Sequence, residues 1–319
     1  MSTDPRIRTV LGDIPAADLG RTDAHEHVFL ASPALPGEEF SDPDRAAEEL
    51  QQVKASGIDA VVDLTTIGLG RRPAALADVS RRAVVHIVAA TGYHRDAHYR
   101  SDHWVSAACR EHLLAAVLAD IEVGIDLSDW TSPFRASSES RAGIVKAGAS
   151  YHRISSTEQL RLEVCAEAAA RTGTPLAVHT EIGTSADDVL DVVEAAGLPA
   201  ARVLLAHLDR NPDAEHHAHL VARGATLVYD TVGRVKYRPE STLLDLCATM
   251  VERGLTAHLM LGTDVGRRST LRAYGGGPGM DVLGRSFLPR LERRIGTPSV
   301  SAILVDTPAA FLTLAEGCP

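Results

Sequence analysis

Short apolar runs alternate with longer amphipathic stretches along the chain. The apolar runs are rich in β-branched and aliphatic residues and have the length of buried strands. We predict strands at 22–28, 60–64, 84–90, 143–147, 176–179, 203–207, 226–229 and 259–264. The stretches between them include predicted helices at 44–56, 157–172, 186–196 and 241–253. Strands that alternate with helices predict a parallel sheet with helical crossovers.

The number and spacing of these units favour an α/β protein with a (β/α)8 TIM barrel as one domain over 1–319. An open doubly wound sheet is the alternative, but no glycine-rich dinucleotide-binding turn follows the first strand. The glycine-rich segment 262–279 is expected to form a long mobile loop after the last strand. Helix-start signals at Thr297-Pro298 and Thr307-Pro308 predict helix near the end of the chain.

Composition narrows the functional classes. The 319 residues are 45% hydrophobic and carry a net charge of −10, which argues against a nucleic-acid-binding protein. No apolar run has the length of a membrane span, and the first six residues lack the apolar segment of a secretory signal. Because the cysteines are scattered, neither a disulfide framework nor a thiolate zinc site is expected, and a cytoplasmic location fits best. The cysteines are Cys109, Cys165, Cys247 and Cys318.

The first predicted strand contains a histidine pair, His25 and His27, separated by one residue. Side chains two apart on a strand project from the same face, so both imidazoles can chelate one divalent metal ion. The pair alone is weak evidence, since the chain has 14 histidines and two hydrogen-bonded histidines would give the same pattern.

Other predicted strands also end in metal-binding residue types. His179 and His207 close two apolar runs, and Asp264 closes the last one. In a barrel of this kind the active site lies where the carboxyl ends of the strands meet. The joint occurrence of these residues at strand ends favours a metal centre over isolated structural histidines.

Lys146 lies inside the apolar run 143–149, where a buried ammonium is costly unless it is paired or neutral. One interpretation is a buried ion pair, for instance with Asp264 or Glu181. The other is a neutral amine that has reacted with carbon dioxide, giving an anionic carbamate that can bridge two metal ions. Spacing alone does not choose between them.

These motifs together resemble the phosphotriesterase family of the amidohydrolase superfamily. The matching segments are 23–27, 143–146, 178–181, 206–213 and 262–264. The resemblance implies a (β/α)8 barrel with two divalent metal ions, often zinc. It implies that His25, His27 and Asp264 hold the more buried ion, that His179 and His207 hold the more exposed one, and that carbamylated Lys146 bridges both. Relatives are often homodimers, although no interface is legible in this sequence.

The resemblance also implies a mechanism. Two cations lower the pKa of a shared water molecule, and the resulting hydroxide attacks a polarised carbonyl or phosphoryl group. Asp264 is the expected catalytic proton acceptor. Asp209 and Arg210 follow His207 and either orient groups around the site or serve as a helix cap and a surface ion pair.

Substrate choice is expected to depend on three loops. Tyr93 and His94 follow the third strand and offer an aromatic wall with a polar tip, although a capped loop would look the same. Cations gather after the seventh and eighth strands, a common phosphate site in barrels, although any one of them could be solvated surface charge. The candidates in these two loops are Arg234, Lys236, Arg267, Arg268 and Tyr274.

The loop 267–279 resembles that of family members that open sugar lactones, some of them phosphorylated. Organophosphate hydrolases of the family have larger apolar pockets, whereas this chain has only 4% aromatic residues. We therefore expect a lactonase for a polar or anionic lactone. An N-acyl-homoserine lactonase or an organophosphate triesterase is the alternative, and a metal-bound binding protein without activity is a third.

Overall fold

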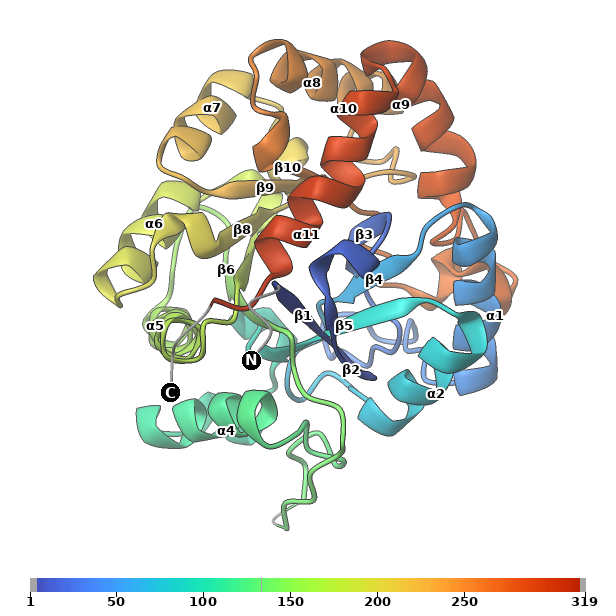
Figure 1. Ribbon diagram of the computed structural model, residues 1–319. Coiled ribbons are helices and arrows are strands. Elements are labelled where there is room, and N and C mark those ends of the chain that lie inside the picture. The colour runs from blue at the N-terminus through green and yellow to red at the C-terminus, as the bar shows by residue number, and fades with distance from the viewer. Residues whose placement is uncertain (1–4, 133, 316–319) are drawn as a thin grey trace.

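The computed structural model describes residues 5–132 and 134–315. Residues 1–4 and Cys318, which enter the sequence argument above, lie outside these ranges. The chain forms a barrel of eight strands surrounded by helices (Figure 1), as the alternating pattern predicts.

Eight parallel strands follow one another around the barrel in chain order. They are β3 (Thr22–Glu26), β4 (Ala60–Asp63), β5 (His86–Gly92), β6 (Ile144–Ala149), β7 (Leu176–Thr180), β8 (Val203–Ala206), β9 (Thr226–Tyr229) and β10 (Leu259–Leu261). The last strand returns to the first, where the Asp264 N–H donates to the His25 carbonyl at 2.9 Å. Gly262 permits this approach, because a Cβ there would lie 3.0 Å from the His25 Cβ. The TIM-barrel prediction is confirmed, and the open doubly wound alternative is wrong.

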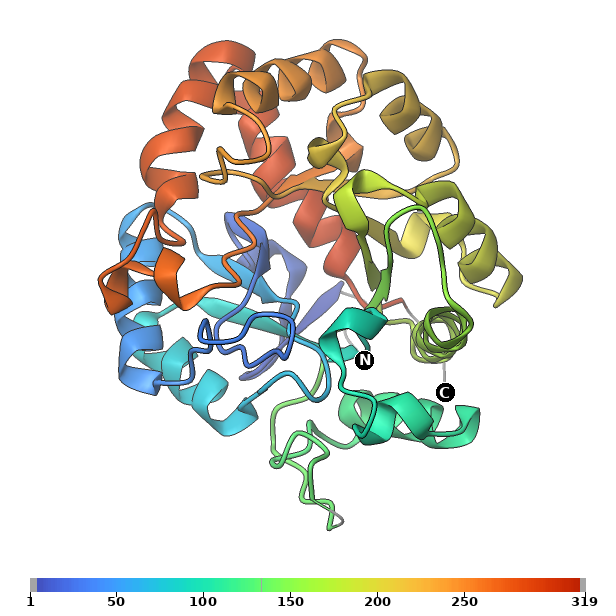
Figure 2. The ribbon, with the colours of Figure 1, turned by 180° about the vertical axis from the view of Figure 1, so that it is seen from behind.

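Helices connect the strands on the outside of the barrel (Figure 2). Local capping explains several boundaries: Ser155 and Glu158 form a reciprocal capping box, and Asp42 and Asp213 cap two other helices. In the described part of the chain no helix is long and apolar enough to cross a membrane. The helices are α1 (Pro43–Ala55), α2 (Pro73–Ala83), α3 (Trp104–Ala107), α4 (Arg110–Glu122), α5 (Ser156–Thr172), α6 (Ala186–Ala195), α7 (Ala214–Ala222), α8 (Glu240–Glu252), α9 (Leu288–Ile295), α10 (Thr297–Ser301) and α11 (Thr307–Leu312).

Strand side chains divide between two apolar cores. In β8, Leu204 and Ala206 point into the barrel, whereas Val203 and Leu205 pack beneath the helices. The barrel interior continues onto Ile7 and other residues outside the eight strands, including Leu19 and Phe311. These belong to a segment before β3 and to α11, and so close one end of the barrel. An N-terminal hairpin, β1 (Arg6–Thr9) and β2 (Gly12–Pro15), was not predicted.

Several predicted boundaries move in the structure. The predicted run 84–90 begins too early, because Val84 ends α2 in a left-handed conformation with φ 56°. The predicted runs 22–28 and 259–264 extend too far, since β3 ends at Glu26 and β10 at Leu261. The predicted helices 44–56, 157–172, 186–196 and 241–253 are confirmed to within one residue at each end.

The loop after β10 is tied to the rest of the molecule rather than free. The Glu49 carboxylate of α1 accepts the backbone N–H groups of Ala273 at 2.8 Å and Met280 at 3.0 Å. Glu38 accepts the N–H and hydroxyl of Ser269 at 2.9 and 2.8 Å. The expected mobility of this segment did not include these hydrogen bonds, because their acceptors lie more than 200 positions earlier in the chain.

Candidate metal centre

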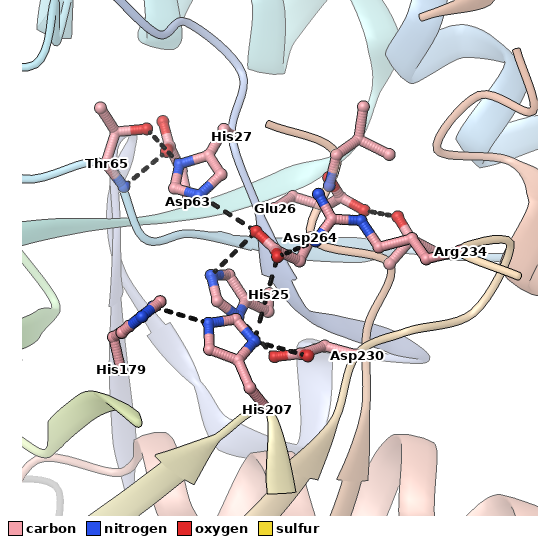
Figure 3. Close-up of polar contacts among 12 residues, drawn as sticks. His25, Glu26, His27, Asp63, Thr65, His179, His207, Asp230, Arg234 and Asp264 are labelled. Atoms are coloured by element: carbon pink, nitrogen blue, oxygen red, sulfur yellow. Dashed lines mark hydrogen bonds and ion pairs between the residues drawn. The ribbon is translucent and has the colours of Figure 1, made fainter. Parts of the chain in front are cut away.

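The ends of the strands bring the predicted ligands together. His25, His27 and Asp264 each place a ligand atom within 4.8 Å of the others, and all are buried. Figure 3 shows Asp264 between the two histidines, with His207 and His179 beside them. His207 directly follows β8, and Asp264 lies three residues after the end of β10. Both have left-handed backbone, with φ 69° and 47°. Such backbone is costly for residues other than glycine, and the surrounding structure must hold it in place.

Each histidine of the first strand uses one ring nitrogen for a hydrogen bond to a residue outside the proposed ligand set. The His27 Nδ1 lies 2.8 Å from the Thr65 hydroxyl. That hydroxyl donates its proton to the Phe29 carbonyl at 3.1 Å, so it accepts from His27 Nδ1–H. The His25 Nδ1 likewise lies 2.8 Å from Asp230. Both Nε2 atoms are then free of protons in the neutral rings, and they face Asp264 Oδ1 at 3.6 Å for His25 and 3.4 Å for His27.

The other two histidines show the same division. The His207 Nδ1 lies in hydrogen-bond contact with Asp230 at 2.7 Å, and the His179 Nε2 with Glu181 at 2.8 Å. The remaining nitrogens, His207 Nε2 and His179 Nδ1, face each other at 2.8 Å. In neutral rings these are two lone pairs in contact, which is unfavourable unless a cation or a proton lies between them. The pair therefore fits a metal ion.

Burial favours the neutral imidazoles that bind metals. It lowers the pKa of His25 and of His179 to about 4, and that of His207 well below its ordinary value. Burial would raise the pKa of Asp230, but the His207 and His25 rings bring it well below its usual range. Asp230 is thus an ionised acceptor, which fixes the protons on the Nδ1 atoms of both rings.

Lys146 projects from β6 and is buried, with 1% of its surface exposed. Its ammonium nitrogen has no hydrogen-bond partner among the described residues, and neither Asp264 nor Glu181 pairs with it within 4.0 Å. The ion-pair alternative is therefore not observed. Burial lowers the pKa of Lys146 to about 8, which favours the neutral amine that carbamylation requires.

Two arginines contact Asp264. Arg210 donates to Asp264 Oδ2 at 2.7 Å, and Arg234 donates to the same oxygen. Burial would raise the pKa of Asp264, but Arg234 and the histidines hold it well below its usual range. Arg210 and Asp209 are both buried, so the alternative of a surface ion pair is wrong. Asp209 accepts the Thr231 N–H at 2.9 Å instead of capping a helix.

A cavity of about 280 Å³ opens over this cluster. We call the cluster of ligand residues the histidine floor, and it consists of His25, His27, Lys146, His179, His207 and Asp264. Three predicted substrate-binding cations line the cavity, and we call Arg234, Lys236 and Arg267 the cationic rim. His94 also lines it, from the loop after β5.

The structure does not bring the other three substrate candidates into this cavity. Tyr93 is fully buried under α4 and donates to the Leu113 carbonyl at 2.8 Å. The Arg268 guanidinium stacks on the Tyr274 ring at 5.3 Å, and the Tyr274 hydroxyl accepts the Asp42 N–H at 3.1 Å. All three side chains are used elsewhere, so the polar wall after β5 is formed by His94 rather than Tyr93.

Sequence reasoning missed several lining and supporting residues. Asp230 follows β9 directly, so the strand-end rule that found His207 could have found it. Tyr237 lines the cavity, and its ring contacts both the Arg210 guanidinium at 4.5 Å and the Lys236 ammonium at 4.8 Å. His98 lines it as well, and no motif in the sequence marks it.

Comparison with known proteins gives the same picture. A model of the phosphotriesterase family matches residues 5–312. The chain belongs to the phosphotriesterase family. This membership confirms the expected family and the prediction of an ester hydrolase.

Individual members of the family are similar over nearly the whole chain. A phospho-furanose lactonase of Mycoplasmopsis agalactiae is 31% identical, with 99% of this chain and 94% of that protein covered. The crystal structure of an amidohydrolase from Mycoplasma synoviae has a TM-score of 0.92 at 30% identity, covering 99% of this chain and 94% of that one. The phosphotriesterase homology protein of Escherichia coli, with phosphate in its active site, has a TM-score of 0.83 at 27% identity, covering 93% and 99%.

Proposed function

We propose that this member of the phosphotriesterase family opens a polar lactone that carries an anionic group, with a phosphorylated sugar lactone as the best candidate. The observation that supports this most is the cationic rim above the histidine floor. A hydrolytic centre and an anion-binding edge then share one cavity. The similarity to a phospho-furanose lactonase points the same way.

The donor set suits two divalent ions such as Zn²⁺, which imidazole nitrogen and carboxylate oxygen bind well. His25, His27 and Asp264 would hold one ion, and His179 and His207 would hold the other. A carbamate on Lys146 would bind both ions. When bound, such a pair supplies a hydroxide near neutral pH and polarises the carbonyl oxygen. The unpaired Lys146 nitrogen and the two facing lone pairs of His179 and His207 support this assignment.

The residues of the chain position the reaction and move its proton. Asp264, ionised in the described structure, would accept the proton of the attacking nucleophile and return it to the leaving alkoxide. Arg210 holds Asp264 Oδ2 at 2.7 Å and so fixes the plane of this carboxylate. Glu181 and Asp230 keep the histidine rings in orientation.

The anionic end of the substrate would lie against the cationic rim. Lys236 takes part in no ion pair within 4.0 Å in residues 5–132 and 134–315, and its ammonium rests only on the Tyr237 ring. Arg267 has a distant partner, Glu38, at 3.7 Å. Both cations are thus available to a ligand, and arginine and lysine suit phosphate. A phosphate is also present in the active site of the similar E. coli protein.

The test is lactone hydrolysis by the zinc-reconstituted protein, followed by proton release. Four substrates would be compared: a phosphorylated furanose lactone, the same lactone without phosphate, an N-acyl-homoserine lactone and a phosphotriester. We expect kcat/KM to be at least about tenfold higher with the phosphate than without it. Equal values would contradict the anionic substrate. Bound metal with no turnover of any ester would indicate a binding protein.

One observation favours an N-acyl-homoserine lactone as the second candidate. A smaller cavity of about 250 Å³ lies beside the first, between the loops after β9 and β10. Val232, Val235, Val265 and Pro278 give it an apolar part, and the three cations of the rim also line it. An acyl chain would fit the apolar part, and the comparison above decides between the two substrates.

A further inference from the structure

The Asp230 carboxylate accepts a hydrogen bond from one histidine of each proposed metal subsite. Its Oδ2 lies 2.8 Å from His25 Nδ1, and its Oδ1 lies 2.7 Å from His207 Nδ1 (Figure 3). The carboxylate is completely buried directly after β9, which pairs with β8, the strand before His207, and is separated by β10 from β3, the strand of His25. Each oxygen therefore serves a different imidazole, and neither is free for solvent or substrate.

The other two histidines have separate outer partners. His27 depends on the neutral Thr65 hydroxyl at 2.8 Å, and His179 depends on Glu181 at 2.8 Å. Glu181 is partly exposed and also pairs with Arg95 at 2.9 Å. Each of these partners touches one ligand histidine, whereas Asp230 touches two.

We propose that Asp230 is a positioning residue that couples the two metal subsites, because one rigid carboxylate orients a ligand of each. This inference rests on the proposed two-metal centre. Both Nδ1–H groups donate to the same anion, so both Nε2 lone pairs are presented to the cavity in a fixed geometry. A movement of one imidazole reaches the other through the shared carboxylate, so loss of that carboxylate weakens both subsites together.

The test compares the rates at which zinc leaves three variants when a chelating dye is added in excess. Glu181→Gln and Thr65→Val are matched controls, because each alters the partner of one ligand histidine. Asp230→Asn removes the charge that serves both rings and leaves one acceptor. We expect wild-type protein to release two ions in two phases. Each control should accelerate one phase, and Asp230→Asn should accelerate both by about 10- to 100-fold.

The outcomes separate this proposal from the proposed function. If the wild type shows two phases and Asp230→Asn accelerates only one of them or neither, the coupling is overturned and the two-metal centre stands. Fewer than two zinc ions in the wild type would overturn the two-metal centre and the coupling with it. If circular dichroism shows that Asp230→Asn is unfolded, Asp230→Glu replaces it. That variant keeps the charge but displaces both oxygens, so both phases should again accelerate, and acceleration of a single phase would overturn the coupling.

Discussion

The floor and the rim of the cavity are built in different ways. On the histidine floor, each imidazole has one nitrogen bound to an outer partner at 2.7–2.8 Å and the other aimed at the proposed metal ions. On the cationic rim, Arg234 is paired with Asp264 of the floor, whereas Lys236 has no ion pair among the described residues and Arg267 has a partner only at 3.7 Å. The floor lies at strand ends, and the rim lies on loops.

This difference separates chemistry from selectivity. A catalytic centre needs side chains whose orientations are fixed before the substrate arrives, and bonds to buried neighbours provide this. A site for an anion needs charges that are not already neutralised. Changes on the floor should therefore affect every substrate, whereas changes at the unpaired rim residues Lys236 and Arg267 should affect only anionic ones.

The largest effect is expected from Lys146→Ala on the floor. Loss of the proposed bridging ligand should lower kcat/KM at least about 1,000-fold and reduce bound zinc from about two ions to one or fewer. Short carboxylic acids should restore part of the activity, because they can occupy the space of the carbamate. Activity and metal content would be measured on the same sample. Full activity in this variant would contradict the bridging role of Lys146.

Metal-free protein should show the cost of burying the Lys146 ammonium. Burial lowers its pKa to about 8, from about 10.4 in an unfolded chain. Between these values the unfolded state binds more protons, so this contribution makes the folded state more stable as pH rises. The free energy of unfolding of the wild type, measured relative to that of Lys146→Met, should rise by up to about 3 kcal/mol between about pH 7 and pH 10. A pH-independent difference in carbonate-free buffer would show that the ammonium is paired.

A smaller and selective effect is expected on the rim. Lys236→Ala should raise KM for a phosphorylated lactone about 10- to 100-fold, because a charge-assisted contact is lost. The unphosphorylated lactone should be nearly unaffected. Arg268→Ala is the matched control, since its guanidinium stacks on Tyr274 outside the cavity. If both variants change both substrates equally, then Lys236 does not contact the phosphate.

The smallest effect concerns the loop after β10, which carries Arg267 of the rim. Glu49→Gln keeps one acceptor for the N–H groups of Ala273 and Met280 and loses the other. We expect Tm to fall by about 2–4 °C and KM for the anionic lactone to rise only a few-fold. Glu48→Gln is the control, because Glu48 is half exposed and pairs only with Arg45 on the surface. An unchanged Tm in Glu49→Gln would mean that other contacts hold the loop.

The same division explains what could be predicted from the sequence. His25, His179 and His207 could be predicted because each ends or lies in an apolar run, and a barrel brings strand ends together. Lys146 could be predicted because a charge inside such a run is costly. Asp230 directly follows the run 226–229, so the same rule would place it beside the ligands.

The rim could not be predicted in the same detail. Tyr93 and His94 are adjacent, and their backbone directions place the first under α4 and the second in the cavity. Arg267 and Arg268 are adjacent as well, and only the first lines the cavity. The path of their loop depends on Glu38 and Glu49, whose contacts span more than 200 residues, so no local pattern reveals it.

An anomalous-difference map of zinc-reconstituted crystals tests the two-metal centre most directly. We expect two peaks about 3.5–4 Å apart, one bound by His25 Nε2, His27 Nε2 and Asp264, the other by His179 Nδ1 and His207 Nε2. We also expect extra density on the Lys146 nitrogen between them. A single peak, or a peak bound by Asp230 and the Nδ1 atoms of His25 and His207, would contradict it.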